Sequence, residues 1–177
     1  MNKIHQVYND KNLQKKILNV LLQKGIVQLQ EVLDKNYLQQ LENLKKKNYD
    51  RIYIPQEKKI SVIKIKDTIL TPCIAFLEQL LQRKVKTTML VIAKKGDYTL
   101  IKDKDKAEQG YDAVLDLTKT WNIAWGGQVV YQKEEMPIPV AYGSITIVKK
   151  NNTKKYVKYI NHHARGTRIF IIFSIND

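Results

Sequence analysis

Arg168 has the most definite chemical requirement of any residue in this sequence. It begins the strongly apolar run Ile169–Phe173, which predicts a buried strand. A buried guanidinium without a partner is costly, so Arg168 must meet an anion. Two kinds of partner satisfy it: a carboxylate ligand held through two hydrogen bonds, or an internal aspartate such as Asp112 or Asp116.

His162 and His163 form a second group that could do chemistry, because neutral imidazole is a common metal ligand. They follow Asn161 and precede Gly166, a context that indicates a turn. Neighbouring residues of a strand point to opposite faces, whereas a turn would allow both rings to approach one ion. The alternative is a pair of solvated turn histidines, and the sequence leaves both interpretations open.

Other chemistries find no support in the sequence. It contains no phosphate-binding glycine loop, no cysteine and histidine spacing typical of zinc sites, and no nucleophile elbow. Cys73 is the single cysteine, so no internal disulfide can form, and its apolar neighbours predict a buried structural thiol. The polar start of the chain lacks the apolar core of a signal peptide, and no run is long enough for a membrane helix. We therefore expect a cytoplasmic protein with no membrane partner.

The composition predicts a basic protein with a sizeable core. Hydrophobic residues make up 44% of the 177 residues, which suits a single domain over 1–177. Lys and Arg number 31 and Asp and Glu 17, which gives a net charge of +14. Such a charge bears on partners rather than on fold, and it favours RNA, the ribosome or another acidic partner. The lysines are scattered along the chain, so a general compositional bias explains the charge equally well.

Three amphipathic helices are predicted in the N-terminal part. The first covers about residues 11–24, between a capping Asp10 and a terminating Gly25. A short strand at 25–30 leads into the second helix, and a further strand is predicted at 51–54, before Pro55. The third follows a strand at 60–65 and carries apolar residues around most of its circumference. Such a helix is expected to lie against a sheet.

From Lys84 onward, short β-rich runs alternate with Gly, Asn, Asp and Pro. The predicted strands are 85–93, 98–101, 113–117, 128–131, 138–140, 144–148, 156–160 and 168–174. Many short strands with regular turns are typical of a sandwich or a jelly roll. We therefore predict an α+β fold, a double-stranded β-helix (jelly roll) of about residues 84–177 flanked by the helical part, about residues 1–83. The densest charge cluster, Lys149–Lys155, predicts a basic hairpin turn.

Five segments follow one another in an order that resembles a known family. They are the strand and helix from Gly25, the run Gly96–Leu100, the turn Trp121–Gly127, the hairpin Pro139–Ile147 and the last strand from Arg168. This order is similar to that of prolyl 4-hydroxylase-like 2-oxoglutarate, iron(II)-dependent oxygenases. The resemblance implies a pocket near Tyr98 in which Arg168 pairs with a carboxylate of 2-oxoglutarate.

The resemblance also implies an iron site made of two histidines and one carboxylate, the first two as a His-x-Asp pair on a strand. The ungapped match puts Lys102 and Lys104 at that pair, and a protonated lysine has no lone pair to give a metal. A shift by one residue would offer Asp103 and Asp105 instead. We prefer the ungapped register because the Gly-Asp-Tyr run fixes it. It predicts that Lys102 points into the barrel mouth near Arg168.

The distal histidine of the family falls on a lysine in this chain. The matching position is Lys158, or Lys155 if the spacing of Val157 and Ile160 is matched. The nearest histidines, His162 and His163, stand only six and five residues before Arg168, which departs from the family pattern.

Two functions follow from these observations. We favour a degenerate, non-catalytic member of the fold, a basic binding module for RNA, the ribosome or a nucleic-acid-associated partner. Arg168, Lys102 and Tyr98 could then hold a small dicarboxylate without metal. The alternative is an active prolyl-type protein hydroxylase that uses iron(II) and 2-oxoglutarate. It would need an unusual metal site, with Asp103 or Asp105 together with His162 or His163.

Overall fold

The computed structural model describes residues 3–46, 61–65, 68–99, 108–132 and 136–175. Their elements, in chain order, are η1 Gln6–Asn9, α1 Lys11–Lys24, β1 Ile26–Leu29, α2 Lys35–Glu42, η2 Asn43–Lys46, β2 Ser61–Lys64, η3 Thr68–Leu70, α3 Thr71–Leu81, β3 Val85–Ala93, β4 Glu108–Asp116, η4 Ile123–Trp125, β5 Val129–Tyr131, β6 Met136–Pro137, β7 Ile145–Thr153, β8 Lys155–Val157 and β9 Arg168–Ile175. The predicted α+β class is confirmed. None of the helices in the described part of the chain has the length and apolarity needed to cross a membrane.

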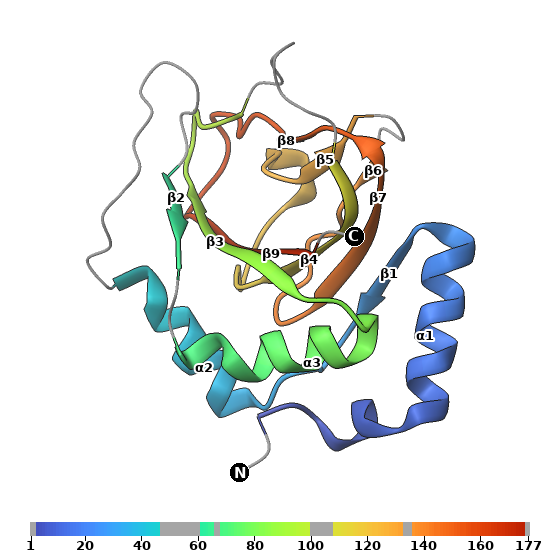
Figure 1. The fold of residues 1–177 in the computed structure, drawn as a ribbon. Coiled ribbons are helices and arrows are strands. Elements are labelled where there is room, and N and C mark those ends of the chain that lie inside the picture. The colour runs from blue at the N-terminus through green and yellow to red at the C-terminus, as the bar shows by residue number, and fades with distance from the viewer. Residues whose placement is uncertain (1–2, 47–60, 66–67, 100–107, 133–135, 176–177) are drawn as a thin grey trace.

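Two antiparallel sheets form the β part, and the predicted jelly roll is confirmed. The larger sheet has the strand order β1-β7-β4-β9-β3-β2, and the smaller one has the order β6-β5-β8. The smaller sheet faces one side of the curved larger sheet, and the helices lie on the other side of the larger sheet (Figure 1). The larger sheet also contains β1, which pairs with β7, and β2, which pairs with β3. The jelly-roll sheet therefore includes two strands that precede Lys84.

The helices begin and end where local signals act on them. The Asp10 side chain accepts hydrogen bonds from the backbone N–H groups of Asn12 and Leu13, and α1 ends at Gly25, whose φ of 73° is left-handed. Both ends of α1 agree with the prediction. Helix α3 differs, because the three-residue helix η3 leads into it and no side chain caps it. Pro72 stands in its first turn, where the missing N–H costs no hydrogen bond.

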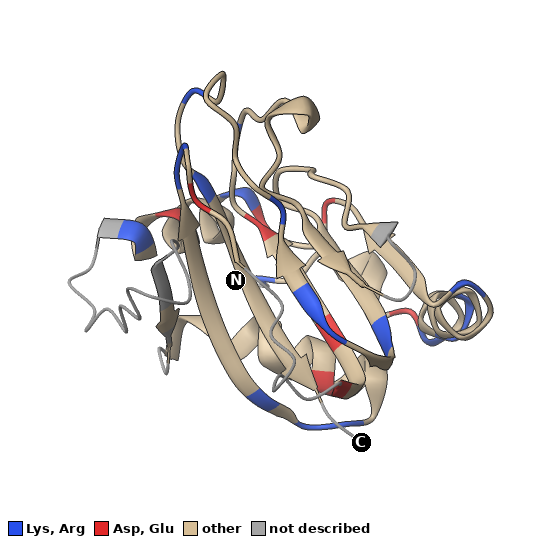
Figure 2. Cartoon of the chain, turned by 90° about the horizontal axis from the view of Figure 1, so that it is seen from above, with Lys and Arg blue, Asp and Glu red and all other residues tan. Residues whose placement is uncertain are grey.

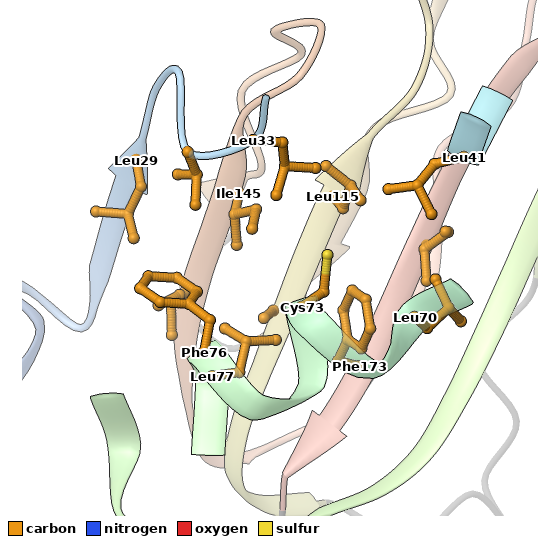
Figure 3. Close-up of a cluster of buried hydrophobic side chains, with 14 of the residues drawn as sticks. Leu29, Leu33, Leu41, Leu70, Cys73, Phe76, Leu77, Leu115, Ile145 and Phe173 are labelled. Carbon is orange, nitrogen blue, oxygen red and sulfur yellow. The ribbon is translucent and has the colours of Figure 1, made fainter. Parts of the chain in front are cut away.

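Two hydrophobic clusters stabilise the fold. The first joins the inward sides of the helices to one face of the larger sheet, with Leu77 and Cys73 of α3 facing Leu115 and Phe173 of the sheet (Figure 3). The second lies between the two sheets and includes Phe170 of β9. Cys73 is fully buried, and its burial raises the pKa of the thiol to about 12. The predicted structural thiol is confirmed.

Several predicted strand limits are wrong around the smaller sheet. Strand β7 continues to Thr153, and β8 begins directly after it at Lys155. The predicted basic hairpin turn over 149–155 is therefore mostly strand, and the side chains of Lys150 and Lys155 are only 1% and 16% exposed. The predicted strand over 138–140 is also wrong, because β6 lies earlier, at Met136–Pro137. The predicted strand at 51–54 lies outside the described residues.

Candidate functional site

Four strands bring five ionisable side chains together, which we call the lysine–carboxylate cluster. Its members are Glu108 and Asp112 of β4, Tyr131 of β5, Lys150 of β7 and Lys155 of β8. The pairing of β4 with β7, and of Tyr131 with Lys155 between β5 and β8, sets these side chains side by side. The cluster thus connects the larger sheet to the smaller one.

Both lysines of the cluster contact both carboxylates. Lys155 Nζ lies 2.8 Å from Asp112 Oδ2 and 3.0 Å from Glu108 Oε2. Lys150 Nζ lies 3.0 Å from Glu108 Oε2 and 3.4 Å from Asp112 Oδ1. The Tyr131 hydroxyl donates a hydrogen bond of 2.6 Å to Asp112 Oδ2. Two ammonium groups and two carboxylates make the cluster electrically neutral.

Burial would by itself raise the pKa of Asp112, whose side chain is 0% exposed. The charges of Lys155 and Lys150 and the hydrogen bonds from Lys155 and Tyr131 outweigh this effect, and the pKa of Asp112 is lowered. Burial likewise disfavours the charged form of Lys155, but Asp112 and Glu108 raise its pKa. Both groups are therefore held in their charged forms.

These shifts predict how stability depends on pH. The lowered pKa of Asp112 contributes stability above the ordinary aspartate pKa of about 3.9, and that contribution is lost as the pH falls through the folded value. The raised pKa of Lys155 contributes stability below the ordinary lysine pKa of about 10.4, and it is lost as the pH rises through the folded value. We expect the difference in melting temperature between the wild type and a Lys155→Met/Asp112→Asn variant to be constant between about pH 5 and 9. Below about pH 5 and above about pH 9, the melting temperature of the wild type should fall toward that of the variant. A difference that changes within the window would contradict the charged forms assigned to Asp112 and Lys155.

Arg168 is held by an internal aspartate. Its Nη1 lies 2.5 Å from Asp116 Oδ1 and 2.5 Å from Thr118 Oγ1, and the residue is 2% exposed. Asp116 also accepts backbone N–H groups, from Thr118 at 2.9 Å and from Ala141 at 3.1 Å. Of the two partners considered for Arg168, the structure thus has the internal one. A carboxylate ligand at Arg168 would share the guanidinium with Asp116.

The other predicted site residues are Tyr98, the histidine pair and the segment 102–105. Tyr98 is half-buried, and its ring packs against Tyr159 with centroids 6.2 Å apart. Lys102, Asp103, Lys104 and Asp105 lie outside the described residues, so the predicted inward direction of Lys102 stays a prediction.

His162 and His163 lie in the predicted turn. Both are exposed, their rings are 3.8 Å apart, and His163 N donates to the Asn161 side chain. This arrangement matches the solvated alternative. Of the two positions matched to the distal histidine, Lys158 is exposed, whereas Lys155 points into the lysine–carboxylate cluster.

Sequence reasoning missed Glu108, Lys150 and Tyr131 as members of a cluster. One signal was available: Asp112 directly precedes the apolar run Ala113–Leu115, with which the predicted strand 113–117 begins. A charge in such a position must be paired. The partners could not be named, because Lys150 and Lys155 lie 38 and 43 residues further along the chain.

The comparisons with known proteins identify the fold. No family model matches this sequence, and no curated protein matches it. Solved structures do match it. A prolyl-4-hydroxylase from Pseudomonas putida has a TM-score of 0.66 at 13% identity, and the match covers 92% of this chain and 98% of that one. A prolyl hydroxylase from Trichoplax adhaerens, in complex with a hypoxia inducible factor peptide fragment, has a TM-score of 0.71 at 13% identity and covers 97% and 92%.

A third similar structure is an oxidoreductase of the 2OG-Fe(II) oxygenase family from Burkholderia pseudomallei. It has a TM-score of 0.67 at 11% identity, and the match covers 94% of this chain and 92% of that one. The chain therefore has the fold of the 2-oxoglutarate oxygenases, as the order of its segments predicted.

The described residues do not fit the iron that this fold implies. Among them, no group of three His, Cys, Asp or Glu side chains could hold a metal ion. The lysine–carboxylate cluster has two carboxylates, but each is already bound to two ammonium groups. A protonated lysine has no lone pair for a metal, and its charge repels a divalent cation.

Proposed function

We propose that this chain is a catalytically inactive protein of the oxygenase fold that acts by binding a partner. The observation that carries the proposal is the pair of contacts that the Lys155 ammonium makes with carboxylates. This residue is one of the two, with Lys158, that match the distal iron ligand in sequence order, and its ammonium contacts Asp112 and Glu108 at 2.8 and 3.0 Å. An ammonium in that place takes over the positive charge that a metal ion would supply.

Arg168 supports the same proposal. In the resemblance, the arginine of the last strand pairs with a carboxylate of 2-oxoglutarate, whereas here Asp116 contacts the guanidinium in a buried pair. Any small dicarboxylate would have to bind through Arg168 without metal, with Lys102 and Tyr98 as the proposed additional contacts. Iron(II) and 2-oxoglutarate are then not cofactors of this chain.

The proposed partner is acidic. The net charge of +14 favours RNA, the ribosome or a nucleic-acid-associated protein. Figure 2 shows Lys and Arg spread over several loops, strands and helices, so total charge alone does not identify the surface that would bind. The lone, buried Cys73 supports a cytoplasmic location for such a protein.

The proposal predicts that the purified protein neither retains iron nor converts 2-oxoglutarate. Metal analysis after incubation with iron(II) should find far less than one iron per chain, and no succinate should form above a protein-free blank. An active bacterial prolyl hydroxylase assayed in parallel provides the positive control. Adding a chelator should leave the melting temperature unchanged, because no metal contributes to the folded state.

The opposite outcome would restore the alternative function. Stoichiometric iron together with succinate formation would mean that Asp103 or Asp105, with His162 or His163, forms an unusual metal site. The chain would then be an active protein hydroxylase.

A further inference from the structure

We propose that three loops at one end of the barrel form a binding surface for single-stranded nucleic acid. The loops are residues 94–98, 123–127 and 158–165, which we call the three-loop surface. The inference rests on the proposed binding function and identifies the place and the kind of ligand. In Figure 1 the chain that leaves β8 runs over the end of the molecule opposite helix α3.

Backbone hydrogen bonds fix the three loops to one another. Gly96 N donates to Ile160 O and Ile160 N donates to Asp97 O, both at 2.9 Å. Gly127 N donates to Lys158 O at 3.0 Å, and Asn161 N donates to Trp125 O at 2.9 Å. The surface is therefore preorganised, which lowers the conformational entropy that binding would cost.

Exposed aromatic and apolar side chains lie on this framework. Tyr159 is 54% exposed and Ile123 is 61% exposed, both high values for such large side chains. The ring of Tyr98 packs against that of Tyr159, and Trp125 packs edge-on against Trp121 with ring centroids 5.3 Å apart. Unpaired bases stack on exposed aromatic rings of this kind, whereas the bases of a duplex are already stacked.

The same three loops carry positive charge. Lys94, Lys95, Lys158 and Arg165 are all exposed. The one acidic residue in the three loops is Asp97, and its carboxylate accepts a hydrogen bond of 2.7 Å from the Lys94 backbone. Four cations beside exposed rings complement a chain of phosphates with unpaired bases. A merely acidic peptide would use the charges but would leave the tyrosines without a specific partner.

The experiment uses the full chain and fluorescently labelled 20-mers: single-stranded RNA, single-stranded DNA and the DNA duplex of the same sequence. Anisotropy should show tighter binding of a single strand than of the duplex. Tyr159→Ser should weaken single-strand binding about fivefold or more, since stacking of one base contributes about 1–3 kcal/mol. Lys94→Ala/Lys158→Ala should reduce the slope of log affinity against log salt by about 1.4, since each phosphate contact on a single strand contributes about 0.7.

Matched variants on helix α1 provide the controls. Leu22→Ser removes an apolar side chain that is 59% exposed, and Lys15→Ala/Lys16→Ala removes two exposed charges. Neither should change binding by more than about twofold. Equal losses in the two sets of variants, equal affinity for the duplex, or displacement of the oligonucleotide by polyglutamate at matched charge would overturn the proposal. Iron and succinate assays on the same preparation test separately whether the protein is catalytically inactive.

Discussion

Replacing Lys155 by methionine should lower the free energy of unfolding by about 3 kcal/mol or more. The change leaves Asp112, with a side chain that is 0% exposed, and Glu108 to share the single ammonium of Lys150. Breaking a buried ion pair by removing one partner typically costs about 3–5 kcal/mol, because a buried charge loses its compensation. For a chain of this size, 3 kcal/mol corresponds to a decrease of about 6–12 °C in melting temperature.

A second substitution should recover much of that loss. Asp112→Asn alone leaves Lys150 and Lys155 with only Glu108, an excess of positive charge. Combined with Lys155→Met, it leaves Lys150 paired with Glu108 at 3.0 Å, and the cluster is neutral again. The introduced amide can still accept the hydrogen bond that Tyr131 donates. The double variant should therefore be more stable than either single variant.

Urea unfolding of the four proteins measures this as a double-mutant cycle. We expect a coupling energy of about 3 kcal/mol or more between the two positions, at the upper end for side chains in direct contact, because the double variant is more stable than both single variants only if the coupling exceeds each single loss. Lys158→Met is the control, because Lys158 is an exposed neighbour on the same segment and its loss should change stability by less than about 0.5 kcal/mol. Additive effects of Lys155→Met and Asp112→Asn would mean that the cluster does not act as a unit.

Local signals made helix α1 and its neighbours predictable. A capping aspartate, a 3.6-residue repeat of leucines and a terminal glycine act over one helix, and the structure places Asp10 and Gly25 at the two ends of α1. The β-rich apolar runs of strands β3, β4 and β9 are equally local signals, and the order of the segments then predicted the jelly roll. The division at Lys84 into a helical part and a jelly-roll core was less informative about the sheet, because β1 and β2 precede Lys84 and join the larger sheet through pairings with distant strands.

The lysine–carboxylate cluster was harder to predict, because whether a lysine is expected to be exposed or buried depends on which carboxylates lie beside it. Lysines between Lys149 and Lys155 predict a solvated turn when they are considered along the chain. The pairing of β4 with β7 places two carboxylates beside Lys150 and Lys155, and burial of the lysines then becomes favourable. Arg168 was easier, since a charge beginning an apolar strand must be paired, although sequence alone could not choose Asp116 over Asp112 or a ligand.

Gly126→Ala should be the most disruptive small substitution in the described part of the chain. Gly126 has φ 87° and ψ −154°, a conformation essentially restricted to glycine. A Cβ at this position would lie 1.9 Å from the backbone oxygen of Tyr159 and 2.9 Å from its carbonyl carbon. Backbone atoms cannot move aside as a flexible side chain can. We expect a loss of about 4 kcal/mol or more in the free energy of unfolding, beyond the 1–3 kcal/mol of the strained φ alone.

Gly166→Ala separates the steric effect from the strain. Gly166 also has a positive φ, 97°, but nothing lies within 4 Å of an added Cβ. It should therefore cost only about 1–3 kcal/mol, so urea unfolding should show a clearly larger loss for Gly126→Ala. Equal losses would mean that the close approach of Gly126 to Tyr159 does not determine the stability of this region. If Gly126→Ala still folds, it must displace the backbone of Tyr159, and single-strand binding at the three-loop surface should weaken with it, whereas Gly166→Ala should leave that binding within about twofold of the wild type.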